Sequence, residues 1–213
     1  MKIALLGAES TGKSDLGKLL TQHFMAQGHS VQHIPEYLRT WCDLHQRTPR
    51  KEEQLSIATE QIRQIKTAPA CDVLIADTTP LMVAVYSDFI FGDDSLYDVA
   101  LDFQRSFDIT LLMGLDIAWV ADGIQRDGPH VREPVDAKIR ASLARGGIKY
   151  SIVYGSGDAR LQHALRCFKT TDQDLELKLQ HQKQPQKRRD WACERCSDPV
   201  CEHRLFVDLL NKS

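Results

Sequence analysis

The 213-residue sequence lacks a long uninterrupted hydrophobic run, an excess of charge of one sign and internal repeats. Its longest apolar run, residues 109–120, is interrupted by Asp116 and is too short to span a bilayer. The formal net charge is −2 at pH 7, which gives no general reason to expect nucleic acid or a membrane as a partner. With no secretory leader before the first predicted strand, we expect a cytoplasmic protein.

The composition is that of a globular protein, with 42% hydrophobic and 26% charged residues. We expect one main domain over residues 1–170, a polar and basic linker over 171–190 and a Cys/His-rich tail over 191–213. Six cysteines in a reducing compartment do not indicate a disulfide framework, and three of them lie within residues 193–201. Such crowding is more typical of a metal site.

The first fourteen residues contain the most specific motif of the sequence. An apolar run over residues 3–6 predicts a buried strand, and the next eight residues match the P-loop pattern G-x-x-x-x-G-K-[ST] at the start of an amphipathic stretch. Backbone N–H groups of such a loop wrap around phosphate oxygens at the positive end of a helix. We expect Lys13 to reach the β- and γ-phosphates of ATP and the Ser14 hydroxyl to bind Mg²⁺. The predicted nucleotide-binding residues of the loop are Gly7, Ala8, Glu9, Ser10, Thr11, Gly12, Lys13 and Ser14.

Strand and helix patterns alternate after this loop. Predicted helices lie between predicted strands, and this alternation indicates a parallel, doubly wound α/β sheet with helices on both faces. The further strands are predicted over residues 31–34, 71–77, 109–113 and 150–154, and the helices over 51–66, 81–90, 96–103 and 135–143, with another helix after Gly155.

Two carboxylates follow predicted strands at the edge where open α/β sheets bind ligands. Asp77 closes the third strand, where P-loop enzymes keep the acid that organises Mg²⁺. It could instead be the N-cap of the next helix, a position that Thr78 or Thr79 could equally take. Glu36 follows the second strand, next to Tyr37 and Arg39, and these three residues form a candidate substrate wall. The alternative is a surface loop with an exposed ion pair of little energetic value.

Arginines recur after the fourth predicted strand. Arg126 and Arg132, followed by Arg140 and Arg145, suit a lid that brings guanidinium groups to the transferring phosphoryl group, although a solvated helix has the same pattern. Gly155, after the fifth strand, would allow close approach of the backbone to the adenine, or it belongs to a plain turn.

Four motifs in this order resemble a known family: the P-loop, Glu36-Tyr37 with Arg39, Asp77-Thr78, and Trp119-Val120 with Asp122-Gly123. Together they look like the nicotinamide riboside kinase domain of NadR-type proteins and its AAA-like relatives, over residues 1–165. The resemblance implies a P-loop kinase with strand order 2-3-1-4-5 and a ribonucleoside substrate whose base stacks on Trp119, although Trp119 could instead belong to the core. The sequence departs from the family pattern at Thr79, where a carboxylate is expected, and at Gln125, which displaces the expected arginine to position 126.

These observations predict an ATP- and Mg²⁺-dependent kinase that phosphorylates a nucleoside-like small molecule, with nicotinamide riboside as the first candidate. Glu36 would orient or deprotonate the attacking hydroxyl, while Lys13, Ser14, Asp77 and the lid arginines position and neutralise the phosphates. The alternative hypothesis is a regulatory P-loop module that binds or slowly hydrolyses ATP and signals to a protein or nucleic-acid partner.

The tail carries a possible metal site. Three thiols and one imidazole within eleven residues suit the closed tetrahedral Cys₃His set that structural zinc prefers, whereas the alternative is a disordered tail with free thiols. The predicted zinc ligands are Cys193, Cys196, Cys201 and His203, and the basic residues around them are Lys187, Arg188, Arg189, Arg195 and Arg204. This basic patch could contact nucleic acid or an acidic partner, although such runs are usually solvated.

Overall fold

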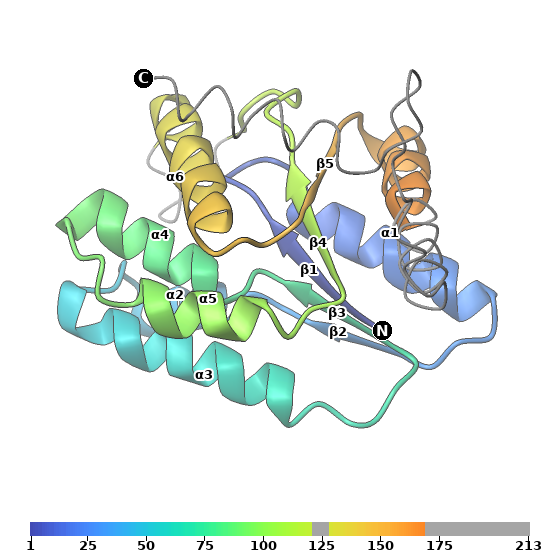
Figure 1. The fold of residues 1–213 in the computed structure, drawn as a ribbon, viewed down its shortest axis with the longest axis horizontal. Helices are drawn as coiled ribbons and strands as arrows, with labels where there is room; N and C mark the ends of the chain where they lie inside the picture. Colours follow the sequence, from blue (N-terminus) through green and yellow to red (C-terminus); the bar gives the residue numbers. More distant parts are fainter. Residues whose placement is uncertain (121–127, 169–213) are drawn as a thin grey trace, which may run out of the picture. The chain divides into compact units, whose positions relative to one another are not determined.

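The fold is known from a computed structural model, which describes residues 1–120 and 128–168 (Figure 1). Its centre is a five-stranded sheet in which all neighbouring strands are parallel and the order is β2-β3-β1-β4-β5. The α/β class and the strand order 2-3-1-4-5 are therefore confirmed. The strands are β1 (Lys2–Leu6), β2 (Val31–Ile34), β3 (Val73–Asp77), β4 (Ile109–Met113) and β5 (Ser151–Val153).

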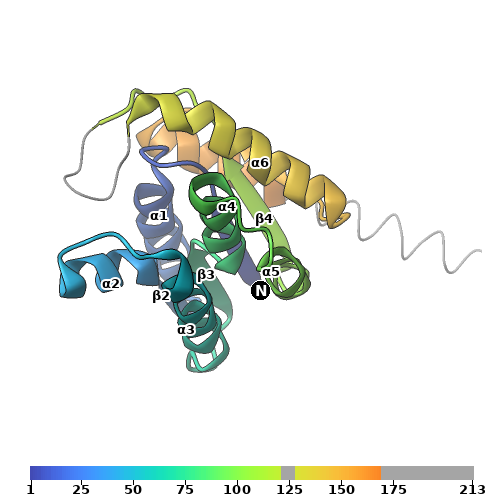
Figure 2. The same cartoon turned by 90° about the vertical axis from the view of Figure 1, so that its left-hand side faces the viewer.

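Helices cover both faces of this sheet. One face is covered by α1 and by a helix over residues 157–168, and the other by α3, α4, α5 and α6 (Figures 1 and 2). The helices are α1 (Lys13–Ala26), α2 (Tyr37–His45), α3 (Gln54–Lys66), α4 (Pro80–Phe91), α5 (Tyr97–Gln104) and α6 (Arg132–Arg145), and short 3₁₀ turns precede α3 (Lys51–Glu53) and α6 (Pro129–Val131).

The central strand β1 shows why the sheet is covered on both sides. Ile3 and Leu5 pack in the core beneath α1, while Ala4 and Leu6 point to the opposite layer, and all four side chains are fully buried. A strand with two buried faces has no polar alternation, which is why its sequence is a continuous apolar run. The main chain of β1 is thereby fixed at the point where the P-loop begins.

Helix α2 was not predicted. We assigned residues 35–41 to a wall or a surface loop, but the chain is helical from Tyr37, and Trp41 and Cys42 are buried against the core. The spacing of Tyr37, Leu38, Trp41 and Cys42 is the helical i, i+1, i+4, i+5 pattern, so the signal was present in a short segment. The helix turns Glu36 into its N-terminal cap position, at the carboxyl end of β2.

Within residues 1–120 and 128–168, no helix is both long and apolar enough to cross a bilayer. The predicted linker, the predicted zinc ligands and Arg126 lie outside the described residues.

Candidate nucleotide and acceptor site

The P-loop connects β1 to α1 and is shaped by its two glycines. A Cβ atom at Gly7 would lie 2.9 Å from the Cβ atom of Met113, so no larger residue fits against β4 there. Gly12 has a left-handed φ of 75° and caps α1, and the Thr11 hydroxyl closes the loop by donating a hydrogen bond to the Ala8 carbonyl at 2.7 Å. The loop therefore presents the N-terminus of a long helix, which attracts anions.

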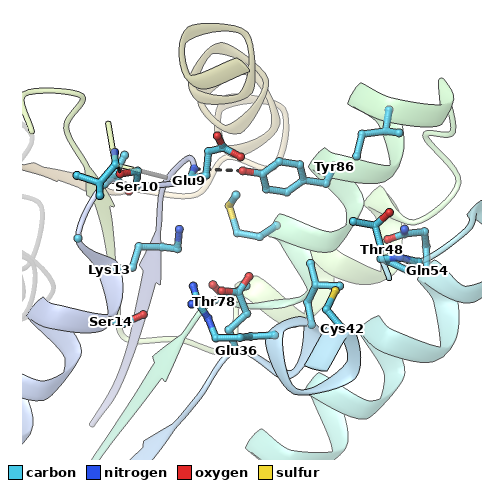
Figure 3. A pocket seen from close by; sticks show the side chains of 18 of the residues that line it. Glu9, Ser10, Lys13, Ser14, Glu36, Cys42, Thr48, Gln54, Thr78 and Tyr86 are labelled. Atoms are coloured by element: carbon cyan, nitrogen blue, oxygen red, sulfur yellow. Dashed lines mark hydrogen bonds between the residues drawn. The ribbon is translucent and has the colours of Figure 1, made fainter. Parts of the chain in front are cut away.

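Lys13 and Ser14 begin α1 and face the cleft beside the loop (Figure 3). The Lys13 ammonium donates hydrogen bonds to the carbonyls of Gly7 and Ala8, at 2.8 and 3.0 Å, so its charge lies across the mouth of the loop. A cation held there by the main chain is suited to contacting terminal phosphates.

Asp77 and Thr78 lie at the carboxyl end of β3, beside the end of β1. Asp77 is 3% exposed, and its Oδ1 has no hydrogen-bond partner among the described residues. Thr78 has a left-handed φ of 81°, an unusual and strained conformation for a threonine, and it lines the cleft. The orphaned carboxylate oxygen of Asp77 and the Ser14 hydroxyl, at the start of α1, are hard oxygen donors of the kind that a partly hydrated Mg²⁺ takes, so the chemistry of these residues fits the ion, although Asp77 is absent from the described cleft lining.

The alternative role of Asp77 in capping the next helix is not observed. Thr79 occupies the N-cap position of α4, and no side-chain hydrogen bond caps that helix. The Thr79 hydroxyl instead donates to the Gln104 side-chain carbonyl at 2.6 Å.

A single cleft of about 1060 Å³ extends from the P-loop to α2, α3 and α4. Figure 3 shows Lys13 and Ser14 on one side of it, Thr48 and Gln54 on the other, and Glu36 and Cys42 between them. Of the predicted substrate residues, Glu36 and Arg39 line the cleft, whereas Tyr37 and Trp119 are not part of its described lining. Gly155 and Arg132, predicted to contact ATP, are likewise absent from that lining.

Cys42 lies close to Glu36 in this cleft. Burial, and then the neighbouring charge of Glu36, raise the pKa of the Cys42 thiol. The thiol is therefore a neutral, weakly polar part of the wall at neutral pH.

Trp119, in the segment after β4, is hydrogen-bonded to the P-loop. Its indole N–H donates to Glu9 Oε1 at 2.8 Å, and the same oxygen accepts the backbone N–H of Gly128 at 3.1 Å. The backbone N–H of Val120 donates to the Ser10 hydroxyl at 2.8 Å. The segment after β4 is thus fastened to the loop at three points, and base stacking by Trp119 stays a prediction.

The lid arginines divide into two groups. Arg140 forms an ion pair with Asp136 at 2.6 Å, and Arg145 forms one with Asp98 at 2.9 Å, as a solvated helix would show. Arg132 is only 7% exposed, and its Nε and one terminal nitrogen have no hydrogen-bond partner among the described residues. Buried guanidinium donors without a partner are suited to an anionic ligand.

Arg160 supports the loop and was missed by sequence reasoning. It is 2% exposed, donates to the Thr11 carbonyl and forms an ion pair with Asp116 at 3.0 Å. Burial lowers the pKa of this guanidinium, and the charge of Asp116 opposes that shift. A charged residue within the apolar pattern of the last helix was the available signal.

Tyr86 was also missed. Its hydroxyl accepts the backbone N–H of Glu9 at 3.2 Å, and its ring lines the cleft together with Met82, one turn earlier on α4 (Figure 3). The spacing of four residues on a helix that follows a strand end placed both side chains on one face.

The described residues contain no group of three or more His, Cys, Asp or Glu side chains that could hold a metal ion by themselves. Since the predicted zinc ligands lie outside these residues, zinc binding stays a prediction.

A parallel sheet of order 2-3-1-4-5, with a P-loop after its central strand, defines a P-loop NTPase of the nucleoside-kinase-like fold. The chain belongs to an AAA domain family, whose model matches residues 2–160. No curated protein matches the chain.

Solved structures show the same fold at low sequence identity. Deoxyadenosine kinase from M. mycoides, with dCMP and dCDP bound, is 18% identical with a TM-score of 0.53, over 81% of this chain and 100% of that chain. NadR protein in complex with NR is 18% identical with a TM-score of 0.62, over 78% of this chain. NadR protein with NAD and AMP-PNP is 16% identical with a TM-score of 0.61, over 80% of this chain. The match covers 49% of NadR in both cases, so this chain corresponds to about half of that protein.

Proposed function

We propose that this chain is an ATP- and Mg²⁺-dependent kinase that phosphorylates a hydroxyl group of a small nucleoside, with nicotinamide riboside as the first candidate. One observation carries the proposal: a single cleft contains both the P-loop, with Lys13 and Ser14, and the carboxylate of Glu36. Phosphoryl transfer requires a phosphate cradle and an acceptor-side base within one space. The NR bound to NadR and the products dCMP and dCDP bound to deoxyadenosine kinase support a nucleoside as the acceptor class.

The residues around the loop would act on the phosphates. Lys13 would bind the β- and γ-phosphates. Ser14 and Asp77 are the residues that would hold Mg²⁺, which would supply charge neutralisation for the transferring phosphoryl group. Arg132 would contribute to the same charge through two buried donor atoms that have no hydrogen-bond partner among the described residues, and Arg126 remains a predicted lid residue.

Glu36 would act on the acceptor. It follows β2 at the carboxyl edge of the sheet, lines the cleft and caps α2. In this position it would accept the proton of the attacking hydroxyl and orient its oxygen. Tyr37, Arg39 and Trp119 are proposed as further acceptor contacts, and Gly155 as the adenine contact.

The test is transfer of phosphate from ATP to a panel of nucleosides in the presence of Mg²⁺. We expect Glu36→Gln to lower kcat about 100-fold or more, since general base catalysis contributes about 10²- to 10⁴-fold. Glu52→Gln is the matched control, because Glu52 also lines the cleft but lies on the 3₁₀ turn before α3, and we expect it to retain activity within about threefold of wild type.

ATP hydrolysis without transfer to any nucleoside would contradict the kinase and favour the regulatory P-loop module. Thermal stability separates the two functions independently: a kinase is stabilised by nucleoside beyond the effect of ATP, whereas the regulatory module responds to ATP alone.

We further propose that the tail holds one structural zinc ion through Cys193, Cys196, Cys201 and His203. The support is the ligand spacing in the sequence. Elemental analysis of freshly reduced protein should give about one zinc per chain, which the double variant Cys193→Ser, Cys196→Ser loses while keeping ATP binding. Metal-free wild-type protein would exclude the site.

A further inference from the structure

Two buried glutamines on α3 differ in how their side chains are used. Gln61 is 1% exposed, accepts the backbone N–H of Tyr37 at 2.7 Å and donates to the Pro35 carbonyl at 3.3 Å. Gln54 lies seven residues earlier, on the same face of the helix, and is 4% exposed. Its amide forms no hydrogen bond with any other residue that the structure describes, and it lines the cleft. Gln61 is therefore a structural residue, whereas the amide of Gln54 is left available to the cleft.

A buried side-chain amide that has no hydrogen bond to another described residue is unusual. Buried side-chain amides are nearly always hydrogen-bonded, because an unpaired one has lost its hydrogen bonds to water without gaining others. Water satisfies such a group only until a ligand displaces it, and then the ligand must supply the complementary groups. The amide of Gln54 thus points to a polar group on whatever occupies this end of the cleft.

The position of Gln54 identifies which part of the acceptor it would meet. Lys13 and Ser14 lie on one side of the cleft, Gln54 lies beside Thr48 on the other, and Glu36 lies between them (Figure 3). A hydroxyl that is phosphorylated near Glu36 leaves the base of the nucleoside extending toward Gln54. The nearby walls include Met82 and the Tyr86 ring, which suit a flat heterocycle.

A glutamine amide has one carbonyl acceptor and an NH₂ donor side by side. Its best partner is another amide edge, with an adjacent carbonyl and N–H, as in a carboxamide or a nucleobase lactam. A carboxylate has only acceptors, so it would place one oxygen against the glutamine carbonyl without a hydrogen bond. The side chain therefore distinguishes an amide from the corresponding acid.

We propose that Gln54 is a specificity-determining residue that selects a nucleoside acceptor by the amide edge of its base and rejects the carboxylate analogue. This assignment rests on the proposed kinase function. It adds a residue and a chemical rule for choosing the acceptor.

The experiment compares nicotinamide riboside with nicotinic acid riboside, which differ at the carboxamide alone. The wild-type protein should prefer the amide nucleoside by about tenfold or more in kcat/KM, since one hydrogen-bonded pair is at stake. Gln54→Leu should reduce this preference to about two- to threefold or less, through a higher KM for the amide nucleoside and little change in kcat. Gln64→Leu is the matched control, because Gln64 lies on the same helix, bonds to Glu60 at 3.0 Å and is absent from the described cleft lining.

Thermal stabilisation by each nucleoside, measured with ATP present, reports nucleoside binding independently of phosphate transfer. Binding with the expected preference but without transfer overturns the kinase and leaves the assignment of Gln54 intact. Transfer with a preference that Gln54→Leu does not change overturns the assignment and leaves the kinase intact. Failure of the amide nucleoside to bind, or a preference for the acid that Arg50→Gln abolishes, also overturns the assignment.

Discussion

The two ends of the cleft are built in different ways. At the P-loop end, eight consecutive residues supply the phosphate cradle, which is formed mainly by their backbone N–H groups. At the acceptor end, the walls come from α2, the residues before α3, and α4, which are far apart in the sequence. The P-loop end is formed by one continuous segment with a recognisable sequence motif. The acceptor end is formed only where several helices pack at the same edge of the sheet.

With the proposed kinase function, this difference predicts where substrate choice resides. Backbone N–H groups bind phosphate in the same way in nucleotide-binding proteins that catalyse different reactions. Side chains such as Glu36 and Gln54 can change while the sequence of the loop stays the same, because they belong to separate elements. We therefore expect variants at the loop end to abolish activity, and variants at the acceptor end to alter selectivity and KM.

The largest expected effect is at the loop. Lys13→Ala removes the cation that lies across the loop mouth and should lower kcat/KM about 1000-fold, as expected for losing a main source of charge stabilisation. Steady-state transfer assays measure the change. Lys18→Ala is the control, because Lys18 also lines the cleft from α1. A loss as large as that of Lys13→Ala would show that the effect is not specific to the lysine at the loop mouth.

The second-largest expected effect is on stability, at Arg160, which is hydrogen-bonded to the P-loop. Arg160→Met removes the guanidinium bound to the Thr11 carbonyl and strands Asp116, so we expect the free energy of unfolding to fall by about 3 kcal/mol. Denaturant unfolding measures it. Arg145→Met is the matched control, because its ion pair with Asp98 is exposed and should contribute less than about 1 kcal/mol. Equal losses would mean that Arg160 has no special role.

The contact between the two ends gives a smaller effect. Tyr86→Phe removes the oxygen that accepts the Glu9 N–H, so we expect a loss of about 1 kcal/mol of stability and a several-fold higher KM for the acceptor. Tyr97→Phe serves as control, since its hydroxyl donates to Asp88 at 2.9 Å and it is absent from the described cleft lining. A similar KM change in both variants would place the effect outside the cleft.

The smallest effect concerns pH at the helices behind the acceptor wall. The Lys138 ammonium, and to a lesser degree the Tyr97 hydroxyl, hold the pKa of Asp88 on α4 below its ordinary 3.8. Because the unfolded chain binds this proton more readily, the stabilisation is present above about pH 4 and is lost as the pH falls through the lower folded-state pKa. We expect Asp88→Asn to cost about 1 kcal/mol or less at pH 7, and the difference from wild type to shrink in acid. A difference that is constant from pH 7 to pH 2 would exclude the ionic origin; unfolding at several pH values measures it.

Sequence patterns predicted the strands well because a fully buried strand is an apolar run whatever its neighbours are. They failed at α2, where nine residues carry a helical pattern shorter than the windows in which periodicity is clear. They also failed for Arg160 and Tyr86, whose roles depend on partners 149 and 77 residues away. For Trp119 the sequence predicted base stacking, which stays a prediction, and it did not predict the hydrogen bond to Glu9, which joins residues 110 positions apart.

The sequence by itself determined the P-loop, the succession of strands along the chain, and the carboxylates that follow β2 and end β3, because each of these follows from neighbouring residues and backbone chemistry. Only the tertiary structure decided which side chains share the acceptor end of the cleft. Gln54 and Gln61 are both amides on one helical face, and the sequence does not distinguish them. The packing of α2 against α3 gives Gln61 its partners, while Gln54, seven residues earlier at the start of the helix, lines the cleft.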